Sequence, residues 1–175
     1  MNFQFYVEKL NHSDSFKDFI KENPKAYPCS GFFTIDLENI QKPDNKQHID
    51  FFLPEKKEIV SFQLENECKI VPVENFDKEG KFKFEKISLD NNFEFGEIES
   101  LILDEMEKQK IKNKIQKIIL SLQNKEGRDY FIGTIFISGF GLVKVRIDLK
   151  EMKITDFEKK SFMDMVNVFK KKKEN

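Results

Sequence analysis

The sequence predicts an α+β fold: a mainly antiparallel sheet, or a pair of sheets, with one long central helix, a short N-terminal helix and a C-terminal amphipathic helix. Apolar and polar residues alternate in short segments over most of the chain, and from residue 97 to 123 the apolar ones recur every three or four residues instead. The length of 175 residues suits a single compact domain, 1–175. An alternative with two similar units, 1–92 and 93–175, that share a core stays open.

The N-terminal half is predicted to contain a strand, a short helix and then a meander of strands. Phe3, Phe5 and Val7 lie on one side of an extended segment, which indicates an opening strand over residues 2–8. The segment SDSFKDFIKENP predicts a helix that ends at its Asn-Pro pair. The strands that follow are FFTIDL, HIDFFL, EIVSFQL, CKIVPV and KFKFEKISL. Because proline cannot donate to a neighbouring strand, Pro72 places the fourth of these at a sheet edge.

The central segment carries the helical period. Its apolar residues are Ile98, Leu101, Ile102, Met106, Ile111, Ile115, Ile118, Ile119 and Leu122. They predict one long helix over residues 97–123, and the five-residue step from Met106 to Ile111 indicates a kink. Acidic residues come first and lysines later, the order that complements the helix dipole. The lysines therefore indicate a solvated helix face rather than a nucleic-acid footprint.

The C-terminal half is predicted to be three strands and a helix. The strands are DYFIGTIFI, LVKVRIDL and KITDFE, and the helix begins at Ser161 with a capping-box pattern. Gly139-Phe140-Gly141 stands between two strands, so it lacks the helix N-terminus that a dinucleotide-binding loop requires. It predicts a tight hairpin instead, whereas Gly133 inside a strand indicates a bulge or a close approach.

An internal repeat is a further hypothesis. Residues 33–37 align with 133–137, and 52–62 align with 147–157, with five extra residues in the first copy. Chance similarity explains the few identities equally well. If the repeat is real, it predicts two antiparallel sheets, each backed by its own helix.

The segment VKVRIDLKEMKITDFE resembles the end of PepSY-like and cystatin-like domains, through Ile147, Asp148 and Ile154. In those domains a helix is followed by an antiparallel sheet whose last hairpin turns after a Val/Ile-Asp pair. The resemblance covers about 60 residues at most, and Glu151-Met152 stand where the family usually has a Thr-Gly turn. Because such domains are mostly inhibitory or binding modules, the resemblance implies a binding role.

The composition disfavours several classes of ligand and cellular location. The net charge is −1 and Arg occurs only at 128 and 146, which disfavours nucleic acid and anionic membranes. No leader pattern and no long apolar run is seen, so we expect a small soluble cytoplasmic protein. With two Cys, two His and 20 Phe, we expect a phenylalanine-lined core and neither a metal nor a cofactor.

Three alternatives involve ionisable or basic residues. Asp129, Asp148 and Lys150, with Glu99 or Glu105 from the helix, resemble the acid, acid and lysine set of a metal-dependent nuclease. Cys29 and His48 form a second hypothesis, a nucleophile and base, against the ordinary interpretation of a buried thiol. Lysines and phenylalanines alternate in KFKFEK, which suits nucleic-acid binding but equally a half-buried strand.

The prediction that we favour is a non-enzymatic module that binds another protein or a second copy of itself. Its contact would be a sheet edge or the last helix, where Phe162, Met163, Met165 and Phe169 exceed what one buried face needs. The metal-dependent nuclease and the nucleic-acid-binding protein are the alternatives.

Overall fold

The structure, a computed structural model, describes residues 2–39, 41–73 and 84–161. Within these residues the chain forms three helices and one eight-stranded antiparallel sheet. The helices are α1 Phe3–His12, α2 Asp14–Glu22 and α3 Phe95–Lys108. The strands are β1 Tyr27–Asp36, β2 Lys46–Leu53, β3 Glu58–Gln63, β4 Lys69–Val73, β5 Ile115–Lys125, β6 Arg128–Ile137, β7 Gly141–Asp148 and β8 Lys153–Ser161.

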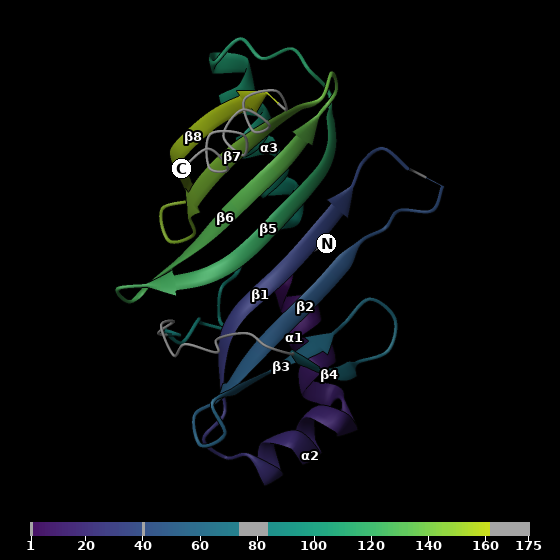
Figure 1. Ribbon diagram of the computed structural model, residues 1–175, viewed down its shortest axis with the longest axis vertical. Coiled ribbons are helices and arrows are strands. Elements are labelled where there is room, and N and C mark those ends of the chain that lie inside the picture. Colours follow the sequence, from purple (N-terminus) through teal and green to yellow (C-terminus); the bar gives the residue numbers. More distant parts are fainter. Residues whose placement is uncertain (1, 40, 74–83, 162–175) are drawn as a thin grey trace, which may run out of the picture.

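The sheet consists of two meanders that start from a central pair of strands. Its order is β4-β3-β2-β1-β5-β6-β7-β8, so each meander runs outward from the β1–β5 pair. The three helices lie on one face of the sheet (Figure 1). We call the opposite side the open face, although over β2 it is partly covered by Phe84, whose ring lies 5.3 Å from that of Phe52. Successive residues of a strand point to opposite sides, so each strand sends one set of side chains to the helices and another to the open face.

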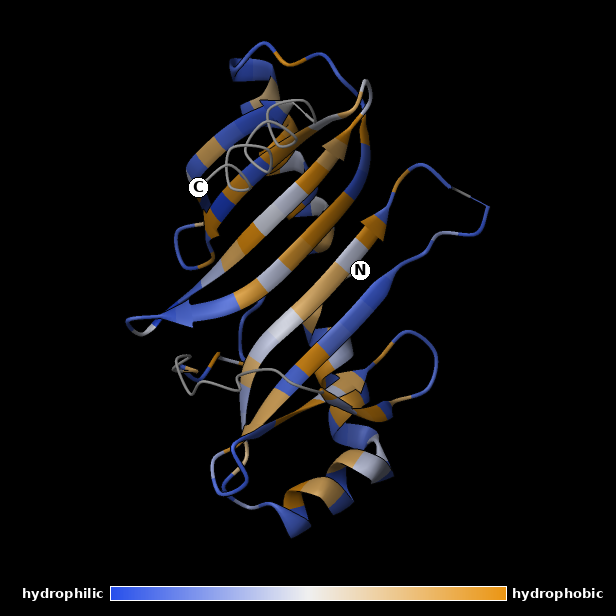
Figure 2. Ribbon diagram, in the orientation of Figure 1, coloured by the Kyte–Doolittle hydropathy of each residue, from blue (hydrophilic) through white to orange (hydrophobic). Residues whose placement is uncertain are grey.

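The core between helices and sheet is built largely on phenylalanine, as predicted. The largest fully buried side chains include Phe3, Phe33, Phe51, Phe62 and Phe131. Phe33 joins the two halves, since its ring lies 6.0 Å from those of Phe3 and Phe131 and 5.0 Å from that of Phe95. Figure 2 shows apolar residues alternating with polar ones along the strands.

The predicted strand at residues 2–8 is wrong, because this segment forms α1. Phe3, Tyr6, Val7 and Leu10 are buried at helical spacing, whereas Phe5 is 53% exposed. The side chain of Asn2 accepts a hydrogen bond from the backbone N–H of Phe5 and caps the helix. Phe3 and Val7 fit both the two-residue period of a strand and the 3.6-residue period of a helix. The Asn2 cap and the burial of Tyr6 and Leu10 favour the helix.

The predicted long helix over 97–123 is also wrong. α3 ends at Lys108, the chain turns through Lys110 with φ 56°, and Ile115–Lys125 is strand β5. The five-residue step after Met106 marks the end of the helix and not a kink. Ile118, Leu120 and Leu122 then alternate toward the core with period two, and β5 hydrogen-bonds to β1 on one side and β6 on the other.

The strand predictions fare differently along the chain. Six of the strands, β2–β4 and β6–β8, are confirmed close to their predicted bounds, and Pro72 lies on the edge strand β4. The predicted strand FFTIDL is part of β1, which begins five residues earlier, at Tyr27. In KFKFEKISL, the described residues 84–89 form no strand. The predicted last helix is contradicted at its start, since Ser161 ends β8 opposite Gly141. Phe162, Met163, Met165 and Phe169 lie outside the described residues.

The glycines of β6 and its turn have the structural roles that a hairpin requires. Gly139 and Phe140 have φ values of 79° and 57°, and they connect β6 to β7 as the hairpin prediction states. Gly133 lies in regular pairing without a bulge, and a Cβ at this position would be 2.6 Å from a methyl group of Val145. Gly133 therefore makes room for a side chain of the adjacent strand.

The symmetry of the strand order differs from the sequence alignment of the two halves. The order about the central pair relates β1 to β5 and β2 to β6. The sequence alignment instead relates residues of β1 to residues of β6. The two differ by one strand, because residues 115–125 form β5 and not the predicted helix. The sequence repeat itself stays a hypothesis.

Candidate functional site

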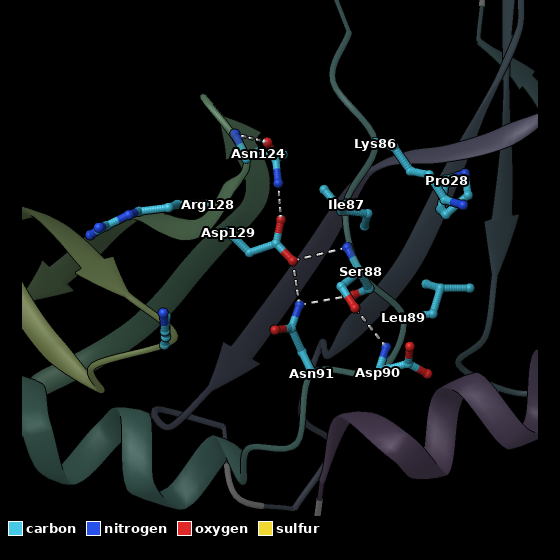
Figure 3. Close-up of a pocket in the computed structure, with 12 residues that line it drawn as sticks. Pro28, Lys86, Ile87, Ser88, Leu89, Asp90, Asn91, Asn124, Arg128 and Asp129 are labelled. Carbon is cyan, nitrogen blue, oxygen red and sulfur yellow. Dashed lines mark hydrogen bonds between the residues drawn. The ribbon is translucent and has the colours of Figure 1, made fainter.

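A cavity of about 620 Å³ lies where the segment 84–93, which links the two halves, passes the β5–β6 hairpin (Figure 3). It is lined by Pro28, Lys86, Ile87, Ser88, Leu89, Asp90, Asn91, Asn124, Gly127, Arg128, Asp129 and Lys150. Residues from β1, the linking segment, the β5–β6 hairpin and the β7–β8 turn therefore meet around one space. Two of the predicted nuclease residues, Asp129 and Lys150, are among them.

Asp129 is the central polar group of this cavity. Its Oδ2 accepts hydrogen bonds from the backbone N–H of Ser88 at 2.9 Å and from the side-chain amide of Asn91 at 2.7 Å. Its Oδ1 accepts a third from the amide of Asn124 at 2.7 Å. Figure 3 shows all three donors around the one carboxylate. Asp129 thus holds the linking segment against the hairpin, with hydrogen bonds to both of its oxygens.

Asp148 organises a turn. It is 4% exposed, and its Oδ1 accepts hydrogen bonds from the backbone N–H groups of Lys150 at 2.9 Å and Glu151 at 3.1 Å. Its Oδ2 lies 3.6 Å from the guanidinium of Arg128. This side-chain-to-backbone pattern is the one with which an aspartate stabilises a tight turn, here between β7 and β8.

The two glutamates of the predicted nuclease set lie elsewhere. Glu99 lines a separate cavity of about 120 Å³ beside Tyr6 and Phe33. Glu105 bonds to Gln109 at 3.0 Å and pairs with Lys108 at 3.3 Å, and these contacts lower the pKa of its carboxyl group. Within residues 2–39, 41–73 and 84–161, no group of three or more His, Cys, Asp and Glu side chains could hold a metal ion.

Cys29 and His48 do not form a nucleophile and base. The Cys29 side chain is 4% exposed, and burial, followed by the charge of Asp50, raises the pKa of its thiol to about 12. His48 pairs across the sheet with Phe32, and its Nε2 lies 2.7 Å from a carboxylate oxygen of Glu65. A thiol with such a pKa stays protonated near neutral pH, which is the property of a buried structural cysteine.

A second candidate site lies on the open face, at β6. Phe131, Gly133 and Ile135 point to the core, so the residues between them point to the open face. Two of these, Ile132 and Phe136, are 37% and 40% exposed.

One cross-strand neighbour of each of these two residues is basic, and the other is Ser121 for Ile132 and Leu142 for Phe136. Arg146 on β7 is opposite Ile132, Lys144 on β7 is opposite Thr134, and Lys117 on β5 is opposite Phe136. The open-face patch is defined as Lys117, Ile132, Phe136, Lys144 and Arg146.

Sequence reasoning missed the open-face patch. The sequence does contain a sign of it, because the strand DYFIGTIFI carries large apolar residues on both of its sides and only one side can face the core. The local pattern does not reveal the neighbours, because it predicts a helix over residues 115–123, whereas the pairing of Lys117 with Phe136 requires β5 to be a strand. The patch combines exposed apolar surface with positive charge, and it can therefore contact a macromolecule but has no group poised for covalent chemistry.

No helix in the described part of the chain is both long and apolar enough to cross a membrane. Comparison with protein-family models, with curated proteins and with solved structures finds no match. The surface chemistry of the chain is therefore the basis for its proposed function.

Proposed function

We propose that this protein is a small non-enzymatic protein-binding module and that the open-face patch is its binding surface. The observation that carries the proposal is the exposure of Ile132 and Phe136, at 37% and 40%, on a strand inside the sheet. Exposed apolar side chains grouped on one face are typical of an interaction surface. Their fixed strand positions support a preformed surface that binds with little reordering.

The charges of the patch support a partner of particular chemistry. Among the described residues, no carboxylate oxygen lies within ion-pair distance of the side chains of Lys144 or Arg146. The Arg146 guanidinium lies 6.0 Å from the centre of the Tyr130 ring, which holds it near the sheet surface. A protein surface with acidic groups around an apolar anchor is complementary to this arrangement.

Nucleic acid is a weaker candidate for the same surface. Asp156 and Glu158 on β8 lie opposite Arg146 and Lys144 in the same sheet, so the basic surface is narrow and bordered by acidic groups, which suits a few acidic side chains better than a continuous phosphate backbone. The chain as a whole has a net charge of −1. We therefore favour a protein partner.

Two further observations fit a protein-binding role in the cytoplasm. Cys29 and Cys68 are both free thiols, which suits a reducing compartment. The resemblance of the β7–β8 hairpin to PepSY-like and cystatin-like domains, many of which bind or inhibit proteins, points toward the same class of function.

The test is a comparison of two double variants in affinity capture from the source cells. Ile132→Ser/Phe136→Ser changes the patch, and Ile70→Ser/Val71→Ser changes two residues of edge strand β4 that are 45% and 36% exposed. We expect the wild type and the β4 variant to capture the same protein, and the patch variant to lose it at least about tenfold. Circular dichroism checks that both variants fold.

Three other outcomes would contradict the proposal. Equal capture by the patch variant would remove the open face as the binding surface. Loss of capture only in the β4 variant would assign binding to the sheet edge. Tight binding of a single-stranded oligonucleotide that the patch variant abolishes, measured by fluorescence anisotropy, would favour nucleic acid instead.

A further inference from the structure

Phe140 has an unusual position at the tip of the β6–β7 hairpin. Its side chain is 87% exposed, and its backbone has φ 57°. A bulky residue is unfavourable in this left-handed conformation, where Asn or Gly is the usual choice, and an exposed phenyl ring gains nothing from burial. Neither folding nor turn formation accounts for a phenylalanine at this position.

The base of the hairpin tip is held by hydrogen bonds, which restrict where the backbone places Phe140. The side-chain amide of Asn113 donates to the Ser138 carbonyl at 2.7 Å, and the Ser138 N–H donates to the Lys114 carbonyl at 2.8 Å. The N–H of Lys114 donates in return to the Ser138 hydroxyl at 3.1 Å. The hairpin is thereby attached to the loop 109–114 that follows α3.

A groove of about 470 Å³ lies beside this attachment point. It is lined by Leu103, Asp104, Met106, Glu107, Lys110, Ile111, Lys112 and Asn113. Leu103 is 46% exposed, and with Ile111 it gives the groove an apolar part. Asn113 both lines the groove and anchors the hairpin, so the exposed ring and the groove are neighbours at one end of the molecule.

We infer that two copies of the chain associate through this end, with Phe140 of each copy inserted in the groove of the other. A two-fold contact requires a surface that carries both complementary features, a projecting side chain and a groove that receives it. Phe140 and the groove satisfy this requirement because they lie side by side.

The charges around the groove also suit a second copy. Asp104 and Glu107 on α3 are acidic, Lys110 and Lys112 on the loop are basic, and among the described residues none of the four has an ion-pair partner. A surface that carries both signs can be complementary to a rotated copy of itself. The groove lies on α3 and the loop that follows it, on the helix side of the sheet, whereas the open-face patch lies on the opposite side (Figure 1).

Sedimentation velocity over about a hundred-fold range of concentration tests the inference. We expect the wild type to show a monomer–dimer equilibrium and Phe140→Asn, which suits the turn but removes the ring, to weaken it at least about tenfold. Leu103→Asp should weaken it similarly. Ile70→Asp on edge strand β4 and the double variant Ile132→Ser/Phe136→Ser should dimerise like the wild type.

Cysteine cross-linking provides a second measurement that does not depend on loss of binding. In a Cys68→Ala background, Phe140→Cys and Leu103→Cys chains are mixed and oxidised, and the mixed disulfide should form faster than either homodimer. A wild type that stays monomeric at every concentration overturns the inference. So does an association that survives Phe140→Asn, or one that only the open-face variant abolishes.

Discussion

The two halves of the sheet differ in how they are covered and in what packs beneath the helices. β1–β4 lie under α1 and α2, and their core is aromatic: the ring of Phe62 lies 5.1–5.5 Å from those of Phe16, Phe19 and Phe51. Among the described residues, α3 is the helix that covers β5–β8 (Figure 1), and the buried residues of this half are mainly aliphatic, such as Ile102, Ile135 and Val145. The strands of this half are longer on average, and their buried side chains are smaller and more often branched.

The surfaces of the two halves differ as well. Among the described residues of the C-terminal half, the exposed large apolar ones are Leu103, Ile132, Phe136 and Phe140, at the open-face patch and the groove end. The N-terminal half has Phe5 on α1 and the two residues Ile70 and Val71 on its edge strand. The comparison indicates that one half mainly contributes a rigid aromatic core, whereas the other carries the proposed contact surfaces.

The largest expected effect is on the aromatic core. Phe62 is completely buried, so Phe62→Ala should lower the free energy of unfolding by about 3–5 kcal/mol. Ile135→Ala, the same truncation at a fully buried residue of the aliphatic half, should cost less, within about 2–5 kcal/mol. Urea denaturation followed by far-ultraviolet circular dichroism measures both. Equal losses in the two variants would contradict the contrast between the cores.

Gly133→Ala tests the tight packing of the C-terminal half. The added methyl group would meet Val145 at 2.6 Å and Leu120 at 3.2 Å, so we expect a loss of about 1–3 kcal/mol. Adding Val145→Ala should recover part of that loss in a double-mutant cycle. Gly96→Ala is the control, since nothing lies within 4 Å of the new atom. A Gly133→Ala variant as stable as the wild type would show that Val145 on β7 can shift without loss of stability, which would contradict tight packing here.

Asp129→Asn tests the connection between the halves. An amide cannot accept from all three donors, so the unfolding free energy should fall by about 1–3 kcal/mol. Hydrogen exchange should accelerate at residues 88–91 before it does in the sheet. Asp156→Asn, on the exposed face of β8, should change neither quantity. Unchanged protection at 88–91 would mean that Asp129 does not hold this segment.

The last expected effect, which is absent at neutral pH, is a loss of stability at alkaline pH, and it originates in the N-terminal half. Burial, with a contribution from Glu65, raises the pKa of Tyr6 from 10.0 to about 12, and burial raises that of Cys29 from 9.0 to about 12. Both groups are neutral when protonated, so their protonated forms are favoured in the fold. The stability they contribute is present below pH 9 and is lost as pH rises from 9 to 12.

Equilibrium unfolding as a function of pH measures this loss, and Cys29→Ala should make the decline between pH 9 and 12 shallower. Hydrogen exchange at high pH should increase first in β1–β4. Faster exchange that begins in β5–β8 would contradict the assignment of this loss of stability to the aromatic half. A pH dependence of stability that Cys29→Ala leaves unchanged would contradict it as well.

Local sequence determined much of the fold and part of the candidate sites. The alternation of apolar and polar residues predicted seven of the strands, and Pro72 predicted an edge strand. Gly139 predicted a hairpin turn. Each of these features depends on residues that are close together in the sequence. Asp129 and Lys150 were identified as residues that could meet. The donors to Asp129 could not be predicted, since Ser88 and Asn91 precede it by 41 and 38 residues.

Only the tertiary structure decided the remaining elements. The isoleucines of residues 115–122 fit both a helix and a strand, and β5 forms because β1 and β6 satisfy its backbone hydrogen bonds on both sides. Phe3 and Val7 likewise fit both periods until the sheet buries one face of α1. Which side of the sheet stays open follows from where the helices pack, and that placement depends on contacts between distant segments, which no local pattern encodes.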